Sequence, residues 1–170
     1  MKVQEEELPA EAAYDRALDR ALRLLGERAR SRFEVRERLR RAGFSDGIVE
    51  RVDARLVELD ILDDAAFARD WLDLAVGARG RALRAARRDL EERGVARETI
   101  EKALEEFEDQ HQIAEAERAL LIARRRAGTY VSLSPPQAFQ RLAGFLARRG
   151  YEEELVLEVC RAVVGDPESS

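Results

Sequence analysis

The chain has only one cysteine, one histidine, one tryptophan and four prolines in 170 residues, and these scarcities argue against several kinds of protein. A single cysteine (Cys160) excludes an intrachain disulfide and a thiolate metal cluster. The single histidine (His111) has no serine or cysteine motif beside it, and no HExxH or EF-hand spacing is present. No apolar run approaches the roughly 18–20 residues of a membrane span, and the acidic start is unlike a signal peptide. We therefore expect a cytoplasmic protein that has no cofactor, no metal, no membrane contact and no enzymatic activity.

Most of the chain consists of Ala, Leu, Arg and Glu, which favour helices, whereas aromatic residues make up only 6%. This composition predicts an all-α protein. The net charge of −5 and the pI near 5.2 differ from the pI above about 9 that is typical of a nucleic-acid-binding domain. The charge is nevertheless unevenly distributed, because acidic residues crowd positions 5–11 and arginines cluster around 28–41, 79–93 and 118–126.

Three glycines indicate an internal repeat. Gly43, Gly94 and Gly150 each stand four residues after a leucine and directly before an apolar residue, at spacings of 51 and 56 residues. A glycine followed by an apolar residue is typical of a Schellman-type helix end. The positions five, six, nine and thirteen residues after each glycine are mostly apolar, which traces one face of a following helix. This self-similarity predicts a tandem array of helical units.

Helix ends are predicted by capping patterns. Ser31 with Glu34, and Ser134 with Gln137, have capping-box spacing, and Asp63 or Asp64 can cap a helix that follows. With a leading helix before each glycine-ended pair, we expect nine helices, at about 12–29, 32–42, 46–60, 64–77, 81–93, 97–109, 111–127, 135–149 and 152–164. The predicted fold is an elongated array of three helix-turn-helix-like three-helix repeats over residues 10–62, 63–110 and 111–165, with disordered tails at 1–9 and 166–170.

Three features of single residues follow from this arrangement. Cys160 is expected to be a half-buried small residue, since it lies one position past an apolar column. Trp71 is expected in the core, because Phe67 continues its stripe four residues earlier. Tyr130 and Leu133 are expected in a loop that packs the seventh helix onto the eighth.

Arginine stripes are the feature that indicates binding. Arginines recur every four residues on the second helix, on a face other than that of Val35 and Leu39, and the fifth helix has a similar stripe. Such stripes suit an anionic partner, either phosphates or an acidic protein surface. The alternative is a solvated helix face, with arginines near helix C-termini favoured by the helix dipole. The candidate binding residues are Arg32, Arg36, Arg40, Arg79, Arg81, Arg84, Arg87, Arg88 and Arg93.

The repeat motifs resemble the RecX family over roughly residues 15–164. The matching residues are Ala21 to Leu25, Ser31-x-x-Glu34-Val35, Leu39-x-x-x-Gly43-Phe44, Asp63-Asp64-x-x-Phe67-Ala68, Gly80-x-x-Leu83, Leu90-x-x-x-Gly94-Val95 and Leu146 to Tyr151. Two positions depart from the family pattern. Val35 stands where the family usually has Leu, and Gly80 lacks the Pro-Arg pair that commonly follows it.

The resemblance implies a non-enzymatic regulator of the RecA recombinase, active in DNA repair, recombination and the SOS response. Such a protein binds RecA–DNA filaments and lowers recombinase, strand-exchange and ATPase activity. The resemblance also implies weak, non-specific contact with single- and double-stranded DNA. The implied mechanism is steric and electrostatic, with a curved array lying along the filament as a monomer.

Two other functions stay open on the sequence alone. An independent helical DNA-binding module would need polar base-reading residues, and the third, fifth and sixth helices offer few of them. A generic helical protein–protein adaptor would be unaffected by charge reversal at Arg81, Arg84 and Arg88.

Overall fold

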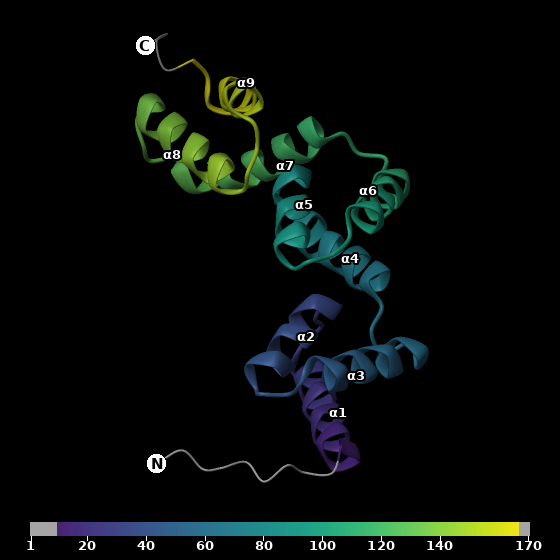
Figure 1. The fold of residues 1–170 in the computed structure, drawn as a ribbon. Coiled ribbons are helices and arrows are strands. Elements are labelled where there is room, and N and C mark those ends of the chain that lie inside the picture. The colour runs from purple at the N-terminus through teal and green to yellow at the C-terminus, as the bar shows by residue number, and fades with distance from the viewer. Residues whose placement is uncertain (1–9, 167–170) are drawn as a thin grey trace, which may run out of the picture.

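The computed structural model describes residues 10–166, which form nine α-helices, one π-helical segment and one short 3-10 turn, with no strand in that range (Figure 1). Of the two predicted disordered tails, residues 1–9 and 167–170 lie outside the described residues. The helices are α1 Ala10–Glu27, α2 Arg32–Arg41, α3 Asp46–Glu58, α4 Asp64–Leu72, α5 Leu83–Glu92, α6 Arg97–His111, α7 Glu115–Ala127, α8 Pro135–Arg148 and α9 Glu153–Val164.

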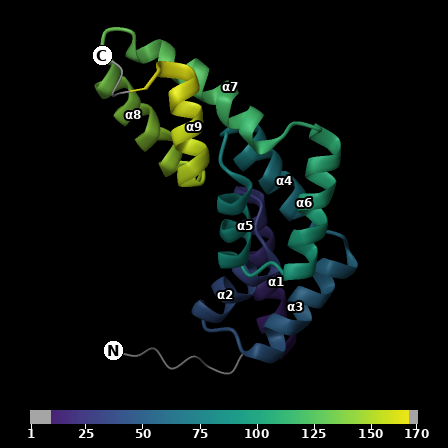
Figure 2. The same cartoon turned by 90° about the horizontal axis from the view of Figure 1, so that it is seen from above.

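The helices form three consecutive groups, α1–α3, α4–α6 and α7–α9, which we call units 1, 2 and 3. Figure 1 shows them following one another through the molecule, and Figure 2 shows unit 3 set to one side of the others. The extensive helix–helix contacts all lie within a unit, such as α1 with α3, α4 with α6 and α7 with α9. The predicted array of three tandem three-helix repeats is therefore confirmed.

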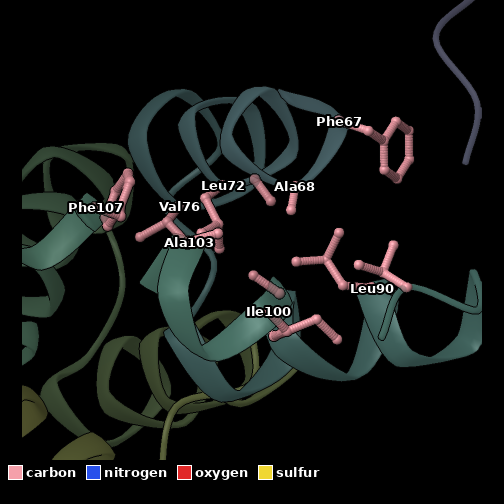
Figure 3. Close-up of a cluster of buried hydrophobic side chains, with 11 residues drawn as sticks. Phe67, Ala68, Leu72, Val76, Leu90, Ile100, Ala103 and Phe107 are labelled. Carbon is pink, nitrogen blue, oxygen red and sulfur yellow. The ribbon is translucent and has the colours of Figure 1, made fainter. Parts of the chain in front are cut away.

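Each unit has its own hydrophobic core, built from the same positions of the repeat. The residues eight and four positions before each glycine have no exposed surface in any unit; they are Val35 and Leu39, Ala86 and Leu90, and Leu142 and Leu146. Figure 3 shows the core of unit 2, where side chains from α4, α5 and α6 meet. Each buried Leu contributes about 1.5–3 kcal/mol to stability. Most of each core therefore comes from the helices of one unit, although Ala82 of unit 2 also joins the core of unit 3.

The three glycines end their helices in the predicted way. Their φ angles are +90°, +72° and +89° at Gly43, Gly94 and Gly150. In unit 1 the Phe44 N–H donates to the Leu39 carbonyl (3.3 Å) and the Gly43 N–H to the Arg40 carbonyl (2.9 Å), and the same pair of bonds recurs in the other units. This is the Schellman motif, whose left-handed residue glycine adopts without a Cβ clash.

The predicted helix starts are also confirmed by cap geometry. Ser31 forms a complete capping box with Glu34, and the Ser134 N–H donates to the Gln137 side chain (3.3 Å). The Asp63 side chain accepts from the Ala65 N–H (2.8 Å) and so caps α4. These bonds satisfy backbone donors that the first turn of a helix leaves without a partner.

Two helices differ from their predicted limits by more than three residues. The fourth, expected as one α-helix over 64–77, changes at residue 73 into a π-helix over Asp73–Ala78, whose wider turn the apolar periodicity does not reveal. The seventh was expected to begin at residue 111, but α6 continues through His111 and α7 begins at Glu115. His111 extends α6 because its ring bonds the Phe107 carbonyl (2.9 Å) and stacks on the Phe107 ring.

The depth of burial of single residues differs in part from expectation. Cys160 is fully buried, not half-buried, because α9 packs on both α7 and α8. Trp71 is half-buried and packs against the unit 2 core, where its ring stacks with that of Phe67 at 6.3 Å. Tyr130 and Leu133 both join the unit 3 core, as predicted for the α7–α8 connection.

At both junctions, the start of the second helix in one unit contacts the helix-ending glycine of the next unit. The N-cap of the second helix in one unit bonds the carbonyl just before the glycine of the next unit. Ser31 Oγ donates to the Arg93 carbonyl (2.5 Å), and the Ala82 N–H donates to the Arg149 carbonyl (2.9 Å). A Cβ added to Gly94 would overlap the Phe33 side chain, and one added to Gly150 would lie 2.5 Å from the Ala85 Cβ. The missing side chain therefore permits the close approach of the units.

Alanine substitutions at Gly94 and Gly43 distinguish two roles of glycine, adopting a positive φ and permitting close contact between units. Both place alanine at positive φ, which costs about 1–2 kcal/mol. Only Gly94→Ala also presses on Phe33, since nothing lies within 4 Å of a Cβ at Gly43. We expect Gly94→Ala to lower the free energy of unfolding by at least about 1 kcal/mol more than Gly43→Ala does, because overpacking adds to the backbone strain. Urea unfolding followed by circular dichroism measures both variants, and equal losses would contradict this account of the junction.

The Cys160 thiol reports on the closure of unit 3. Burial raises the pKa of this thiol to about 11, so at pH 8 it is both enclosed and protonated. Only the thiolate reacts readily with a disulfide reagent. We expect no reaction with dithionitrobenzoate under native conditions and complete reaction in denaturant. Fast reaction of the native chain at pH 8 would show that α9 does not seal the core.

Candidate partner-binding surface

The predicted α2 stripe faces a single hollow at the junction of units 1 and 2. Arg32, Arg36 and Arg40 line this hollow of about 360 Å³, as their four-residue spacing predicts, and Gly94 and Ala96 of unit 2 line it too. We call it the first hollow. Its arginines lie where two units meet, so their surroundings depend on tertiary structure.

Two of the three arginines in the first hollow are engaged inside unit 1. Arg32 binds Asp53 of α3 (Nη2–Oδ2 2.6 Å), and this bond is the main reason why the pKa of Arg32 lies above its usual value. Arg40 bonds Asp46 (2.7 Å) and Glu37 (3.2 Å). These guanidinium groups help to fix α2 on α3, and their charges are already balanced.

The arginines of α5, and Arg81 just before it, are also mostly paired. The partners are Asp89 for Arg81, Glu152 for Arg84, and Glu91 with Glu101 for Arg87. Arg84 donates in addition to the carbonyls of Gly150 and Tyr151, which belong to unit 3. Arg84 therefore joins units 2 and 3, although the sequence placed it among the binding candidates.

Arg93 has the corresponding role between units 1 and 2. Its guanidinium bonds Glu34 (3.0 Å) and lies 4.0 Å from the centre of the Trp71 ring, while Glu34 also binds Arg28 (2.8 Å). Burial acts to raise the pKa of Glu34, but the bonds from Arg28 and the Ser31 N–H outweigh it, so the pKa lies below its usual value. This ion-pair network is the electrostatic part of the junction.

Three of the nine candidates have no carboxylate partner in the described part of the chain: Arg36, Arg79 and Arg88. Arg88 is exposed on α5, and Arg36 is half-buried in the first hollow, where its Nε bonds no described group. Arg79 lies apart from both stripes, on the link between the π-helix and α5. The surface can therefore bind anions through these guanidinium groups.

The comparison with known proteins now decides the family. Models of the first, second and third three-helix domains of RecX match residues 17–56, 63–104 and 114–160. The chain belongs to the RecX family. The resemblance found in the sequence motifs is thereby confirmed, and the three matched domains correspond in order to units 1, 2 and 3.

Relatives of this RecX chain match it over most of its length. The regulatory protein RecX of Thermobifida fusca (strain YX) is 36% identical over 151 residues, which are 89% of this chain and 80% of that protein. The regulatory protein RecX of Amycolatopsis mediterranei (strain U-32) is 32% identical over 155 residues, which are 91% of this chain and 87% of that protein. Both carry the name of a regulator.

Solved structures share the fold. The crystal structure of RecX from Lactobacillus salivarius superposes with a TM-score of 0.69 at 18% identity, covering 90% of this chain and 97% of that one. A crystal structure of regulatory protein RecX gives a TM-score of 0.66 at 19% identity, covering 88% and 72%. At such identities the likeness shows the fold alone.

The structure also brings together arginines that the sequence candidates left out. Arg125, Arg126 and Arg149 of unit 3 lie beside Arg79 of unit 2. Their signal in the sequence is a pair of arginine runs at 124–126 and 148–149. The ends of helices favour such runs through the helix dipole, so the sequence did not distinguish them from a solvated face.

The described residues offer neither a metal site nor a membrane span. Within residues 10–166, no three His, Cys, Asp or Glu side chains are grouped so that they could hold a metal ion. None of the helices described is long and apolar enough to cross a membrane.

Replacing Glu34 by glutamine tests the electrostatic part of the junction. Its pKa is lower in the folded chain than in the unfolded chain, so it stabilises the fold above the unfolded pKa of about 4.3. That contribution is lost as the pH falls from there through the folded value. At pH 7 we expect Glu34→Gln to lower the free energy of unfolding by about 1–2 kcal/mol.

Glu37→Gln is the matched control for Glu34→Gln, because Glu37 pairs only within unit 1, with Arg40 and Arg41. Its loss should be about 0.5 kcal/mol or less. Urea unfolding between pH 3 and 7, roughly the range in which carboxylates titrate, should show a shallower acid dependence for Glu34→Gln than for the unmodified chain. Identical pH profiles would argue against a lowered pKa at Glu34.

Proposed function

We propose that this chain regulates the RecA recombinase by binding RecA filaments on DNA and lowering their recombinase, strand-exchange and ATPase activity. The observation that carries the proposal is the match to all three RecX domains, in chain order. Relatives that bear the name regulatory protein RecX support the same role. The chain then acts by binding alone, as a cytoplasmic monomer without a cofactor.

The repeat architecture supports a filament as the partner. A filament presents the same surface at regular intervals, and an array of similar units presents related surfaces along its length. Arg36 of unit 1 and Arg88 of unit 2 have no carboxylate partner among the described residues, so they can pair with acidic groups outside the chain. A chain lying on the filament blocks its extension or the access of partners sterically, with no chemical step.

The net charge of −5 bears on how the chain contacts DNA. Binding to bare DNA gains affinity from the number of phosphates that are neutralised. An acidic protein with local groups of arginines gains little from DNA in general and more from a target that combines protein and DNA. We therefore propose weak, non-specific contact with single- and double-stranded DNA beside the main contact with RecA.

Inhibition of ATP hydrolysis tests the proposed function directly. The purified chain should slow the hydrolysis of ATP by RecA of the same organism on single-stranded DNA at fewer than one chain per RecA protomer, because one array covers several protomers. A coupled ATPase assay from low to physiological salt measures the rate. An unchanged rate at every ratio and salt concentration would contradict the proposal.

Charge reversal at the unpaired arginines tests the proposed contact. Arg36→Glu with Arg88→Glu should lower the affinity for RecA filaments about tenfold, since repulsion replaces ion pairing at the interface. Co-sedimentation with the filaments measures this affinity. Arg81 and Arg84 are unsuitable for this test, because they bind Asp89 and unit 3. The melting temperature of the variant should stay within about two degrees of the unmodified chain, as for most surface substitutions.

A double variant with the same charge change serves as the control. Arg16→Glu with Arg20→Glu alters two exposed residues of α1 that lie outside both arginine stripes. It should co-sediment as the unmodified chain does. Equal weakening by both double variants would show that only the total charge matters, and no weakening by either would favour a helical adaptor or an independent DNA-binding module.

A further inference from the structure

A second hollow, of about 340 Å³, lies where units 2 and 3 meet. Arg79 lines it from the link before α5, Arg125 and Arg126 from the end of α7, and Arg149 from the end of α8. No aspartate or glutamate is among its lining residues, whereas Asp64 lines the first hollow. None of the four arginines forms an ion pair with any residue in the range 10–166. The second hollow is therefore an uncompensated cluster of positive charge.

Two of these guanidinium groups are held in place by aromatic rings. The guanidinium of Arg149 lies 3.8 Å from the centre of the Phe145 ring, and that of Arg126 lies 5.2 Å from the same ring and 5.3 Å from the Tyr130 ring. Both distances to Phe145 are within the roughly 6 Å range of cation–π attraction. The rings orient the cations without neutralising them.

Hydrogen bonds hold the same two groups by one nitrogen each. Arg126 Nε donates to Tyr130 Oη (2.9 Å), and Arg149 Nε donates to the Arg79 carbonyl (3.3 Å). Their terminal nitrogens bond no other group in the described chain. A guanidinium that is bonded at Nε keeps Nη1 and Nη2 available, and these two nitrogens can bind two oxygens of one anion in a bidentate way.

The charges in the second hollow act on one another. The pKa of Arg149 lies below its usual value, mainly because the group is buried. Tyr151 acts to raise this pKa, while the neighbouring charges of Arg126 and Arg148 lower it further. Like charges that lie close together destabilise each other. An anion bound among them would remove this repulsion.

The wall of the second hollow that belongs to unit 2 is fixed in position. Gly80 has a φ of +63°, and a Cβ there would lie 3.0 Å from Ile122 Cγ2, so the link packs closely on α7. Tyr151 Oη donates to the Gly80 carbonyl (3.2 Å) from unit 3. The link directly follows the π-helix, a rare element that is frequent at functional sites. The arginines of both units are thus held around one space.

We propose that the second hollow binds a phosphate of a nucleic-acid backbone, shared by Arg79, Arg125, Arg126 and Arg149. The proposal rests on the weak DNA contact proposed above and gives that contact a place. The oxygens of a phosphate are arranged tetrahedrally, so several guanidinium groups can bind it from different sides. A planar carboxylate instead suits bidentate binding by one guanidinium group. Contacts of this kind hold the backbone without reading the bases, so binding is independent of sequence.

The test measures binding of a fluorescent oligothymidine 20-mer by anisotropy at several salt concentrations, with no RecA present. The test variant is Arg79→Gln with Arg125→Gln, because neither side chain bonds another described residue. The control variant is Arg124→Gln with Arg141→Gln, which removes two exposed charges of unit 3 outside the hollow.

We expect the test variant to lose about tenfold in affinity and its negative slope of log affinity against log salt to become shallower by about 0.7, the value for one phosphate on a single strand. The control variant should keep both the affinity and the slope. Equal losses in the two variants would overturn the proposed site and leave the DNA contact standing. Absence of binding by the unmodified chain at low salt would overturn the DNA contact and the site together.

Two further measurements complete the test. Polyglutamate should compete for the oligonucleotide much more weakly than polyphosphate of equal charge; equal competition would mark the hollow as a carboxylate site and overturn the proposal. Inorganic pyrophosphate should raise the melting temperature of the unmodified chain and of the control variant, but not that of the single variant Arg125→Gln. This second readout holds even if the double variant folds poorly, and no rise in the unmodified chain would overturn the proposal.

Discussion

At each junction, the glycine that ends a helix in one unit packs against the second helix of the unit before it. Phe33 lies on Gly94, and Ala85 lies on Gly150, with no side chain between the two elements. Because the extensive helix contacts stay within units, these small junctions and the bonds around them fix how the units sit relative to one another. Both hollows described above form at junctions, so their shapes depend on this close approach.

The two junctions use one backbone arrangement and different side chains. Ser31 bonds the Arg93 carbonyl through its hydroxyl, whereas Ala82 bonds the Arg149 carbonyl through its N–H. Each junction also has an ion pair, Arg93 with Glu34 at the first and Arg84 with Glu152 at the second. At the second, Arg149 meets only aromatic rings, carbonyl groups and other cations, which leaves positive charge at the surface. The two junctions therefore differ in their last arginine before the glycine, which is paired with a carboxylate at the first and has no carboxylate partner among the described residues at the second.

Arginine content alone says little about binding in this chain. Most of the arginines in the two predicted stripes neutralise carboxylates within the molecule, and Arg84 and Arg93 join neighbouring units. What distinguishes a binding surface is the local absence of carboxylates, as around Arg79 and Arg125. This distinction also fits the acidic net charge, because local groups of cations can persist in a chain whose average charge is negative.

The all-α class, the nine helices of residues 10–166, most of their caps, the three repeats and the RecX family could all be predicted from the amino-acid order, because these features follow from signals a few residues apart. Apolar spacing, capping boxes and left-handed glycines act within one or two helical turns. The sequence did not predict four features of the folded chain: Arg84 reaches Glu152, Arg149 lies beside Arg79, Cys160 is fully buried, and the fourth helix continues into a π-helix. These depend on the angles at which helices and units meet, and such angles arise from packing between residues far apart in the chain, which local periodicity does not contain.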